Sequence, residues 1–166
     1  MSVIWDIDLD FFPLFDQPLL ELDKLLRWAA RPVDFVVTHH HEAYRHWIAL
    51  VRQRIISPPH LIFHLDEHHD MLSESPPVQF GNYLYFAMRR WPRCRVCWVT
   101  PRPIDYPDMW LSEEAWRSVS TRFACVSDMK RGWPKPDVVS VCISPDFIDE
   151  GLCRKLLERV GQRTSV

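Results

Sequence analysis

Short runs of β-branched and aromatic residues alternate along the chain with stretches in which apolar residues recur every three or four positions. The first pattern is typical of buried strands and the second of amphipathic helices. Their alternation predicts an α/β fold, in which a mainly parallel sheet carries helices on both faces, because parallel strands need long crossover connections. Six strands are predicted, at Val3–Leu9, Val33–Thr38, Leu61–Leu65, Cys94–Thr100, Phe123–Val126 and Val138–Ile143.

Helices are predicted between these strands and after the last one. The first begins near Pro18, since proline is well tolerated in the first helical turn. The last is expected to stop at Gly161, because glycine is common just past a helix end. Residues 1–161 then form a single domain, and 162–166 form a loose C-terminal tail. The other predicted helices are Ala43–Arg54, Asn82–Arg90, Glu113–Val119 and Asp149–Val160.

Charge and composition narrow the classes of partner. The chain has 166 residues, 47% hydrophobic and 25% charged, with a formal net charge of −2. This balance argues against a general attraction to nucleic acid or to anionic membranes. No stretch approaches the ~20 apolar residues of a membrane span, and the N-terminus lacks the basic region of a signal peptide. We therefore expect a cytoplasmic protein that recognises its partner through a defined site, and the sequence leaves its oligomeric state open.

Five cysteines, an odd number in a chain without a secretory signal, favour reduced thiols. Cys94 and Cys97 have the spacing of a CxxC pair. They lie in a predicted strand, however, where residues three apart face opposite sides. A shared metal or redox role for the two thiols is therefore not expected.

Acidic and imidazole side chains follow three of the predicted strands, in the segments DIDLD (6–10), HHH (39–41) and DEHHD (66–70). In open α/β sheets, ligands bind at the carboxyl ends of the strands, so the three segments are expected to form one site. In an extended chain, alternate residues of the first and third segments share one face. By the same pattern Glu67 and His69 point away and support the site, whereas His46, His60 and His64 are interpreted as structural or surface residues.

Carboxylates gathered in this way repel one another unless a multivalent cation neutralises them. Oxygen and imidazole ligands without thiolate favour Mn²⁺, and they also suit Zn²⁺, Fe²⁺ or Co²⁺. Five or six such ligands exceed one tetrahedral site, so we expect two metal ions bridged by shared aspartates.

Other interpretations of the same segments stay open. DxDxD is also found in phosphatases, with Asp6 as nucleophile and Asp8 as acid, and in surface turns. A His-rich run is often a solvated loop. The metal ligands also fit another hydrolase, such as an amidohydrolase or deacetylase, or a peptide-binding protein without activity.

The combined motifs resemble the arginase/agmatinase (ureohydrolase) superfamily, and more closely its small peptide arginases. The stretches that carry the resemblance are WDIDLDFF (5–12), HHHEA (39–43), FHLDEHHDML (63–72), FGN (80–82) and CISPDF (142–147). The resemblance implies a compact three-layer fold, two Mn²⁺ ions and hydrolysis of arginine residues within a peptide to ornithine and urea. It implies as metal ligands Asp6, Asp8, His40, Asp66, His68 and Asp70, with His41 as the close alternative to His40.

The chain departs from that family in two ways. The DxD segment opens the chain, as if the motif order were circularly permuted, and geometry rather than chain order defines a site. Leu84 stands where the family has a proton-shuttling histidine, and the segment 141–143 has no carboxylate to bind the guanidinium group.

Replacements for these missing groups come from the same segments. Candidates to relay a proton to the departing amine are Asp8, Asp10 and His41. Asp146 is the candidate to bind the guanidinium group, and an N-cap of the last helix is its alternative role. Ser144, in the same segment, is also expected to bind the substrate. Asn82 is expected to bind the substrate backbone, or else to stabilise a turn.

The chain is also shorter than a typical arginase, which implies fewer loops over the site and a cleft open to a peptide. Three tryptophans, Trp110, Trp116 and Trp133, are expected either to line such a cleft or to pack in the core.

Overall fold

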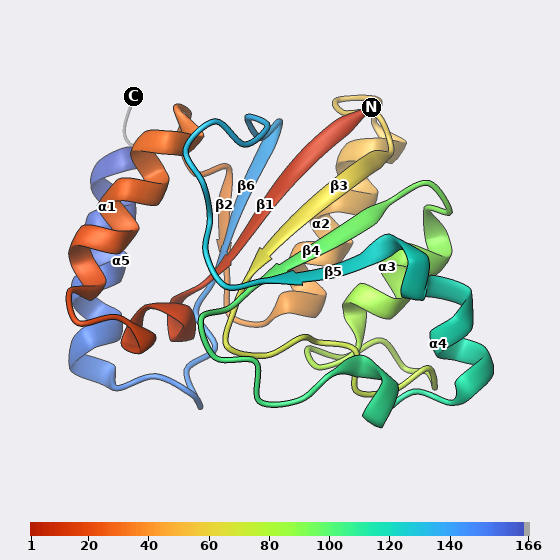
Figure 1. The fold of residues 1–166 in the computed structure, drawn as a ribbon. Helices are drawn as coiled ribbons and strands as arrows, with labels where there is room; N and C mark the ends of the chain where they lie inside the picture. Colours follow the sequence, from red (N-terminus) through yellow and green to blue (C-terminus); the bar gives the residue numbers. More distant parts are fainter. Residues whose placement is uncertain (165–166) are drawn as a thin grey trace.

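The computed structural model describes residues 1–164, which form a sheet of six parallel strands between two layers of helices (Figure 1). The strand order is β2-β6-β1-β3-β4-β5, and every neighbouring pair is parallel. The prediction of a mainly parallel α/β fold is confirmed. The strands are β1 (Ser2–Asp8), β2 (Phe35–Val37), β3 (Pro59–Leu65), β4 (Arg95–Val99), β5 (Phe123–Val126) and β6 (Val138–Cys142).

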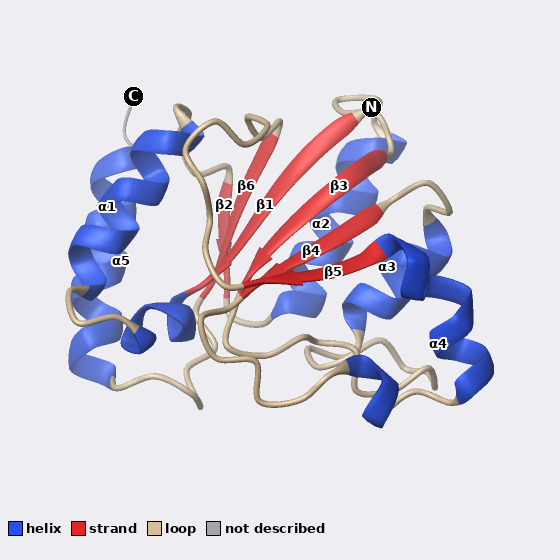
Figure 2. Cartoon of the chain, viewed as in Figure 1, coloured by secondary structure: helices blue, strands red, loops and turns tan. Residues whose placement is uncertain are grey.

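Helices cover both faces of the sheet (Figure 2). The helices are α1 (Pro18–Ala29), α2 (His40–Arg52), α3 (Tyr83–Arg90), α4 (Glu113–Val119) and α5 (Glu150–Thr164). Buried residues of α1 and α5 pack on one face, and buried residues of α2, α3 and α4 pack on the other. The two clusters together make a three-layer domain, since each face of the sheet must bury its apolar side chains.

The central strand β1 shows how the two faces are divided. Trp5 and Ile7 belong to the cluster under α1 and α5, and Ile4 belongs to the cluster under α2 and α3. Asp6 and Asp8 continue the row of Ile4, because alternate residues of a strand share a face. The acidic residues of β1 therefore point toward α2 and α3.

Two helix ends differ from the prediction by three residues or more. Helix α2 begins at His40 rather than Ala43, because the Glu42 carboxylate accepts hydrogen bonds from the backbone N–H groups of Thr38 and His39. Helix α5 continues through Gly161 to Thr164. Glycine inside a helix costs only about 1 kcal/mol, so it does not by itself end one. Of the expected tail, Gln162–Thr164 is helical and residues 165–166 lie outside the described residues.

The chain leaves β1 toward α1 on one face and leaves β3 toward α3 on the opposite face. A crevice forms beyond the carboxyl ends of two neighbouring strands whose connections diverge in this way, and ligands bind there in open α/β sheets. The DxDxD segment spans the carboxyl end of β1, and the DxHxD segment follows β3. Topology alone therefore places both motifs at the same crevice.

The prediction that the CxxC thiols face opposite sides is confirmed. Cys94 packs in the cluster under α2 and α3 and Cys97 in the cluster under α1 and α5, so the two thiols lie on opposite faces as expected. Among the described residues, no helix is long and apolar enough to cross a membrane.

Candidate metal centre

A cavity of about 140 Å³ opens at the carboxyl ends of β1 and β3. Its polar wall consists of side chains from all three motif segments and two loops, and its remaining wall is apolar or glycine. The charged, imidazole and hydroxyl residues that line it are Asp8, Asp10, His40, Asp66, His68, His69, Asp70, Asp105 and Ser144. The other lining residues are Leu72, Phe80, Gly81 and Phe147.

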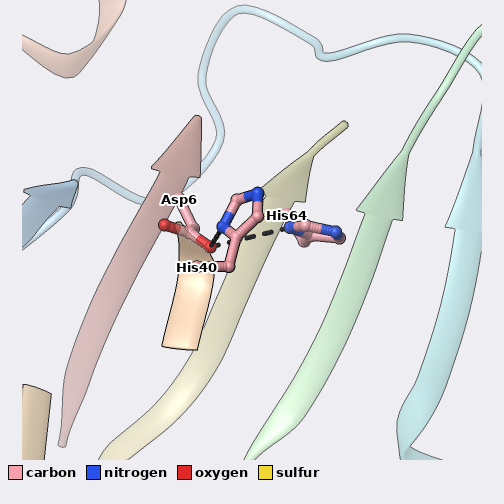
Figure 3. Close-up of side chains that lie close together, drawn as sticks. All are labelled: Asp6, His40 and His64. Carbon is pink, nitrogen blue, oxygen red and sulfur yellow. Dashed lines mark hydrogen bonds and ion pairs between the residues drawn. The ribbon is translucent and has the colours of Figure 1, made fainter. Parts of the chain in front are cut away.

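Asp6 lies behind this wall, fully buried, and does not line the cavity. Figure 3 shows its side chain beside those of His40 and His64. The Ser140 hydroxyl donates to its Oδ1 at 2.5 Å, and the Tyr83 hydroxyl donates to its Oδ2 at 2.6 Å. Burial by itself raises the pKa of Asp6, but His40 and His64 outweigh it and hold the pKa well below the ordinary value. Asp6 was expected as a metal ligand, and with His40 and His64 it forms one of the groups whose ligand atoms lie close enough to hold an ion. Its oxygens also accept hydrogen bonds from protein donors, an arrangement that suits a residue that positions its neighbours.

His40 connects this buried layer to the cavity. Its Nδ1 lies 3.0 Å from Asp6 Oδ2, and its Nε2 points toward three carboxylates. Nε2 is 2.6 Å from Asp8 Oδ2 and 3.0 Å from Asp66 Oδ2. A metal-binding histidine usually has a carboxylate on one ring nitrogen and directs the other nitrogen at the metal, here the nitrogen that points into the group of carboxylates. Of the two alternatives, His40 lies at the site, whereas His41 does not line the cavity.

Asp66 faces two groups of side chains at once. Its Oδ2 is close to Nε2 of His40, and its Oδ1 is 3.4 Å from Nδ1 of His68. Its backbone is also held, because the Trp98 indole N–H donates to its carbonyl at 3.0 Å. Burial favours the neutral acid, but His64 and His40 outweigh this effect and lower the pKa of Asp66. Asp66 is therefore an anion placed to bridge two ligand groups.

Asp8 and Asp10 reach the cavity through a sharp turn. Strand β1 ends at Asp8, whose Oδ1 accepts from the backbone N–H of Asp10, and a 3-10 helix, Leu9–Leu14, begins. The alternation of side chains along an extended chain predicted that Asp10 shares a face with Asp6 and Asp8. The turn ends that row at Asp8, so Asp10 does not continue it. The turn brings Asp10 Oδ2 within 3.2 Å of Nδ1 of His68. Burial and the charge of Asp66 raise the pKa of Asp10 to about 8.

The DxHxD segment is also turned rather than extended. The His68 backbone N–H donates to Asp66 Oδ1, and Asp70 has a φ of 50°, in the left-handed region. Asp70 Oδ2 then comes within 3.8 Å of the imidazoles of both His40 and His64. Burial, together with the charge of Asp66, raises the pKa of Asp70 to about 7. The three side chains converge on one site through this turn and not through a shared strand face.

These residues fit divalent metal ions. The groups Asp10–Asp66–His68 and His40–Asp66–Asp70 each place three ligand atoms within 4.8 Å of one another. Two further groups, Asp8–His40–Cys142 and Asp6–His40–His64, share His40 with the second group. Asp10 Oδ1 and Asp70 Oδ2 are buried oxygens without a hydrogen-bond partner among the described residues. Unpaired buried carboxylate oxygens are costly, and binding a cation would satisfy them.

His64 belongs to this site although it was interpreted as a structural or surface residue without a functional setting. It is fully buried, its Nε2–H donates to the carbonyl of His68, and its Nδ1 lies 3.1 Å from the Tyr83 hydroxyl. The strand register places His64 beside Asp6. The signal was present in the sequence, because His64 and Asp66 are two residues apart and share a strand face. Tyr83 and Ser140 had no such signal.

Ser144 is the one predicted substrate-binding residue that lines the cavity, and its hydroxyl donates to Asp8 Oδ2. Asp146 is exposed and outside the cavity, because a turn closed by the bond from Phe147 N–H to the Ser144 carbonyl directs the chain outward. It is not the N-cap of α5 either, since Asp149 accepts from the Leu152 N–H. The N-cap prediction for Asp146 is therefore wrong, and its carboxylate lies outside the cavity in which it was expected to bind the guanidinium group.

Asn82 is buried, and its amide is committed to the protein. Its Oδ1 accepts from the Gln79 N–H, and its Nδ2 donates to the carbonyls of Ser75 and Pro77. This set of bonds holds the loop before α3, which was the alternative role given for Asn82. Both amide N–H groups are thereby used, and Asn82 does not line the cavity, so the structure supports its role in the turn and not the binding of a substrate.

The cavity mouth carries two aromatic side chains and an acidic loop. Phe80 and Phe147 are 44% and 50% exposed, with ring centroids 6.4 Å apart. Of the three tryptophans, Trp110 is exposed beside the acidic loop residue Asp105, whereas Trp116 and Trp133 pack against the two core clusters. None of the described residues that line the cavity is a lysine or an arginine.

Comparisons of this chain with protein-family models, with curated proteins and with solved structures find no match.

Proposed function

We propose that the protein is a binuclear metal hydrolase that converts arginine residues of a peptide into ornithine and releases urea. The observation that carries the proposal is the position of Asp66, whose two oxygens face two separate groups of ligand atoms. A carboxylate in that position suits two cations side by side. The motif resemblance to peptide arginases supplies the reaction, and Mn²⁺ is the metal that the ligand types favour.

The chain offers a ligand set for each cation. His40, Asp8 and Asp70 lie on one side of Asp66, and Asp10 and His68 lie on the other. Two bound divalent ions would supply a water nucleophile at neutral pH by lowering its pKa from ~15.7 to about 7. Asp6, His64 and Tyr83 would hold His40 in the orientation that coordination requires.

The cavity lining favours a cationic group presented by a peptide. Its polar wall is acidic and contains no lysine or arginine among the described residues, so the α-carboxylate of free arginine has no charged partner there. A peptide lacks that carboxylate at an internal arginine. The exposed aromatic rings at the mouth, Phe80 and Phe147, suit contact with neighbouring peptide residues.

Two candidates for transferring a proton to the departing amine lie at the site. Asp8 and Asp10 line the cavity, whereas His41 does not. Leu84, at the position of the family's proton shuttle, is fully buried in the core. In this proposal a carboxylate of the DxDxD segment therefore passes the proton, and no histidine shuttle enters from α3.

The test is mass spectrometry of arginine-containing peptides and of free arginine after incubation with the Mn²⁺-loaded protein. We expect conversion to ornithine with release of urea, favouring the peptide, and no conversion by the Asp66→Ala variant. If bound metal is verified and neither substrate releases urea, the arginase activity is refuted. A screen of acetylated and amide substrates would then test the other metal hydrolases, and a peptide-binding assay would test a role without catalysis.

The geometry of the site disfavours a phosphatase. A phosphatase that uses Asp6 as its nucleophile needs that carboxylate to reach the substrate. Asp6 is fully buried, accepts hydrogen bonds from Ser140 and Tyr83, and lies outside the cavity lining.

A further inference from the structure

The cavity has a fifth aspartate in its lining that belongs to none of the metal-sized groups. Asp105 lies on the loop after β4, far in sequence from the motif segments, and its side chain is 26% exposed. The other lining aspartates, Asp8, Asp10, Asp66 and Asp70, all belong to groups that could hold an ion. Asp105 is therefore the carboxylate of the cavity that remains available when those four are coordinated.

One ring nitrogen fixes the position of this carboxylate, and a second lies near it. The Trp110 indole N–H donates to Asp105 Oδ2 at 2.7 Å. Nε2 of His69 lies 3.4 Å from Asp105 Oδ1, without forming a hydrogen bond to it. The Met71 backbone N–H donates to His69 Nδ1, so in the neutral ring the proton is on Nε2. The carboxylate is therefore held in place by one neutral donor, the indole of Trp110.

Asp105 has no positively charged partner. Among the residues that the structure describes, no lysine or arginine lies within ion-pair distance of it. An ionised carboxylate accepts about four hydrogen bonds, and Asp105 receives one within normal distance. It therefore has free acceptor capacity beside the cavity.

A second polar group of the same wall is also unpaired. His69 is 1% exposed and lines the cavity, and its Nε2 has no hydrogen-bond partner, because the 3.4 Å approach to Asp105 does not meet hydrogen-bond geometry. A buried donor without an acceptor is costly, and a polar ligand in this part of the cavity would relieve that cost. The loop-side wall thus offers both an anion and an N–H group.

We propose that Asp105 binds the guanidinium group of the substrate arginine. The inference rests on the proposed function and extends it, because it assigns the cation recognition that the segment 141–143 and Asp146 do not provide. A planar guanidinium group donates two parallel N–H groups to a carboxylate, which matches the free acceptor capacity of Asp105. The adjacent exposed indole of Trp110 offers a face on which such a cation can stack.

The test compares Asp105→Asn with Asp108→Asn in the Mn²⁺-loaded protein. Asp108 is an exposed acid on the same loop that does not line the cavity, so its variant removes the same charge without touching the site. The asparagine at position 105 keeps an oxygen to accept from Trp110, which preserves the loop. Substrates are an arginine peptide and the same peptide with citrulline, its neutral counterpart.

With Asp105→Asn, we expect KM for the arginine peptide to rise by about 10- to 100-fold, the size expected for loss of a charge-assisted hydrogen bond. We expect kcat to change by less than about threefold, because binding in the ground and transition states weakens equally. Asp105→Glu should restore most of the lost affinity, and Asp108→Asn should leave KM unchanged. An unchanged KM in Asp105→Asn, or an equal rise in Asp108→Asn, would refute the role of Asp105.

A separate readout distinguishes failure of this inference from failure of the proposed activity. If the wild-type protein releases no urea, fluorescence anisotropy of the labelled arginine and citrulline peptides still measures recognition of the cation. Tighter binding of the arginine peptide, lost in Asp105→Asn and kept in Asp108→Asn, would support Asp105 without an arginase activity. Equal binding of both peptides by the wild-type protein would overturn the inference whether or not urea is released.

Discussion

Asp6 and Asp10 belong to the same five-residue segment, yet their carboxylates are used in opposite ways. Asp6 is surrounded by donors from Ser140, Tyr83 and His40. Asp10 has an oxygen with no partner and faces the cavity. Asp6 thus belongs to a buried layer in which protein donors satisfy its oxygens, whereas Asp10 belongs to a cavity wall in which a carboxylate oxygen has no hydrogen-bond partner among the described residues. A carboxylate of the first kind orients its neighbours, and a carboxylate of the second kind is suited to hold a cation.

The sharpest test of this division is to substitute Asp66, which faces both groups of ligand atoms in the cavity wall. Asp66→Asn removes one charge and one bridging acceptor without changing the size of the side chain. We expect loss of bound Mn²⁺, measured by elemental analysis after desalting, and a fall in kcat/KM of about 10³-fold or more, since the metals supply several kcal/mol.

The stability of the metal-free Asp66→Asn protein serves as its control. A thermal midpoint close to that of the wild-type protein would show that the fold survives. Retention of two Mn²⁺ ions per chain by this variant would contradict the bridging position of Asp66.

A smaller effect is expected from the buried layer. Asp6→Asn places an NH₂ group against one of the donors around Asp6, so His40 loses its fixed orientation. Loss of such a supporting carboxylate typically weakens metal binding by 10- to 100-fold, and we expect a rise of about that size in the Kd for Mn²⁺. Isothermal titration calorimetry measures it. Ser140→Ala removes one donor and keeps the contact between Asp6 and His40, so its Kd should change less; an equal loss would point to general disruption.

The smallest effect concerns the pH dependence of stability without metal. The pKa values of Asp10 and Asp70 are raised to about 8 and about 7 from an ordinary 3.8. At pH values between the ordinary pKa of 3.8 and these raised pKa values, the folded protein binds more protons than the unfolded chain, so the free energy of unfolding falls as the pH rises. His40 acts in the same direction, since its pKa is also raised: burial alone lowers it, but Tyr83, Cys142, Asp6 and Asp8 outweigh that effect.

In EDTA, the thermal midpoint should therefore drop by several degrees between about pH 5.5 and about pH 8. Excess Mn²⁺ should recover the loss at the higher pH, and Asp10→Asn should reduce it. A midpoint that rises with pH in EDTA would show that the cavity carboxylates are not held in a strained, unpaired state.

The sequence was sufficient for the order of elements. All six strands were located from their composition and from the alternation with helical patterns, since parallel strands buried on both faces are short, apolar and bounded by turns. It was also sufficient to bring the motif segments to one edge of the sheet, because the carboxyl ends of parallel strands meet there. Helix ends were less predictable, since capping by Glu42 and the small cost of Gly161 are local effects that periodicity does not record.

Turns accounted for most of what the sequence pattern misjudged. The period-two argument holds while the chain is extended, and it correctly put Asp6 and Asp8 on one face. It fails at Asp10 and Asp70, because a 3-10 helix and a left-handed residue redirect the chain after the strands end. The same argument applied one step earlier would have included His64. Asn82 and Asp146 lie outside the cavity because backbone turns decide where their side chains point.

The sequence by itself determined a parallel α/β domain with aspartates and histidines at the carboxyl ends of neighbouring strands, because strand composition and residue spacing are local properties. Only the tertiary structure decided which of those side chains are satisfied by the protein and which face the cavity. Ser140, Tyr83 and Asp105 come from elements distant in the chain, and their contacts with the motif residues depend on strand register and loop packing. Hydrogen-bond satisfaction is a property of the assembled neighbourhood, so no single segment encodes it.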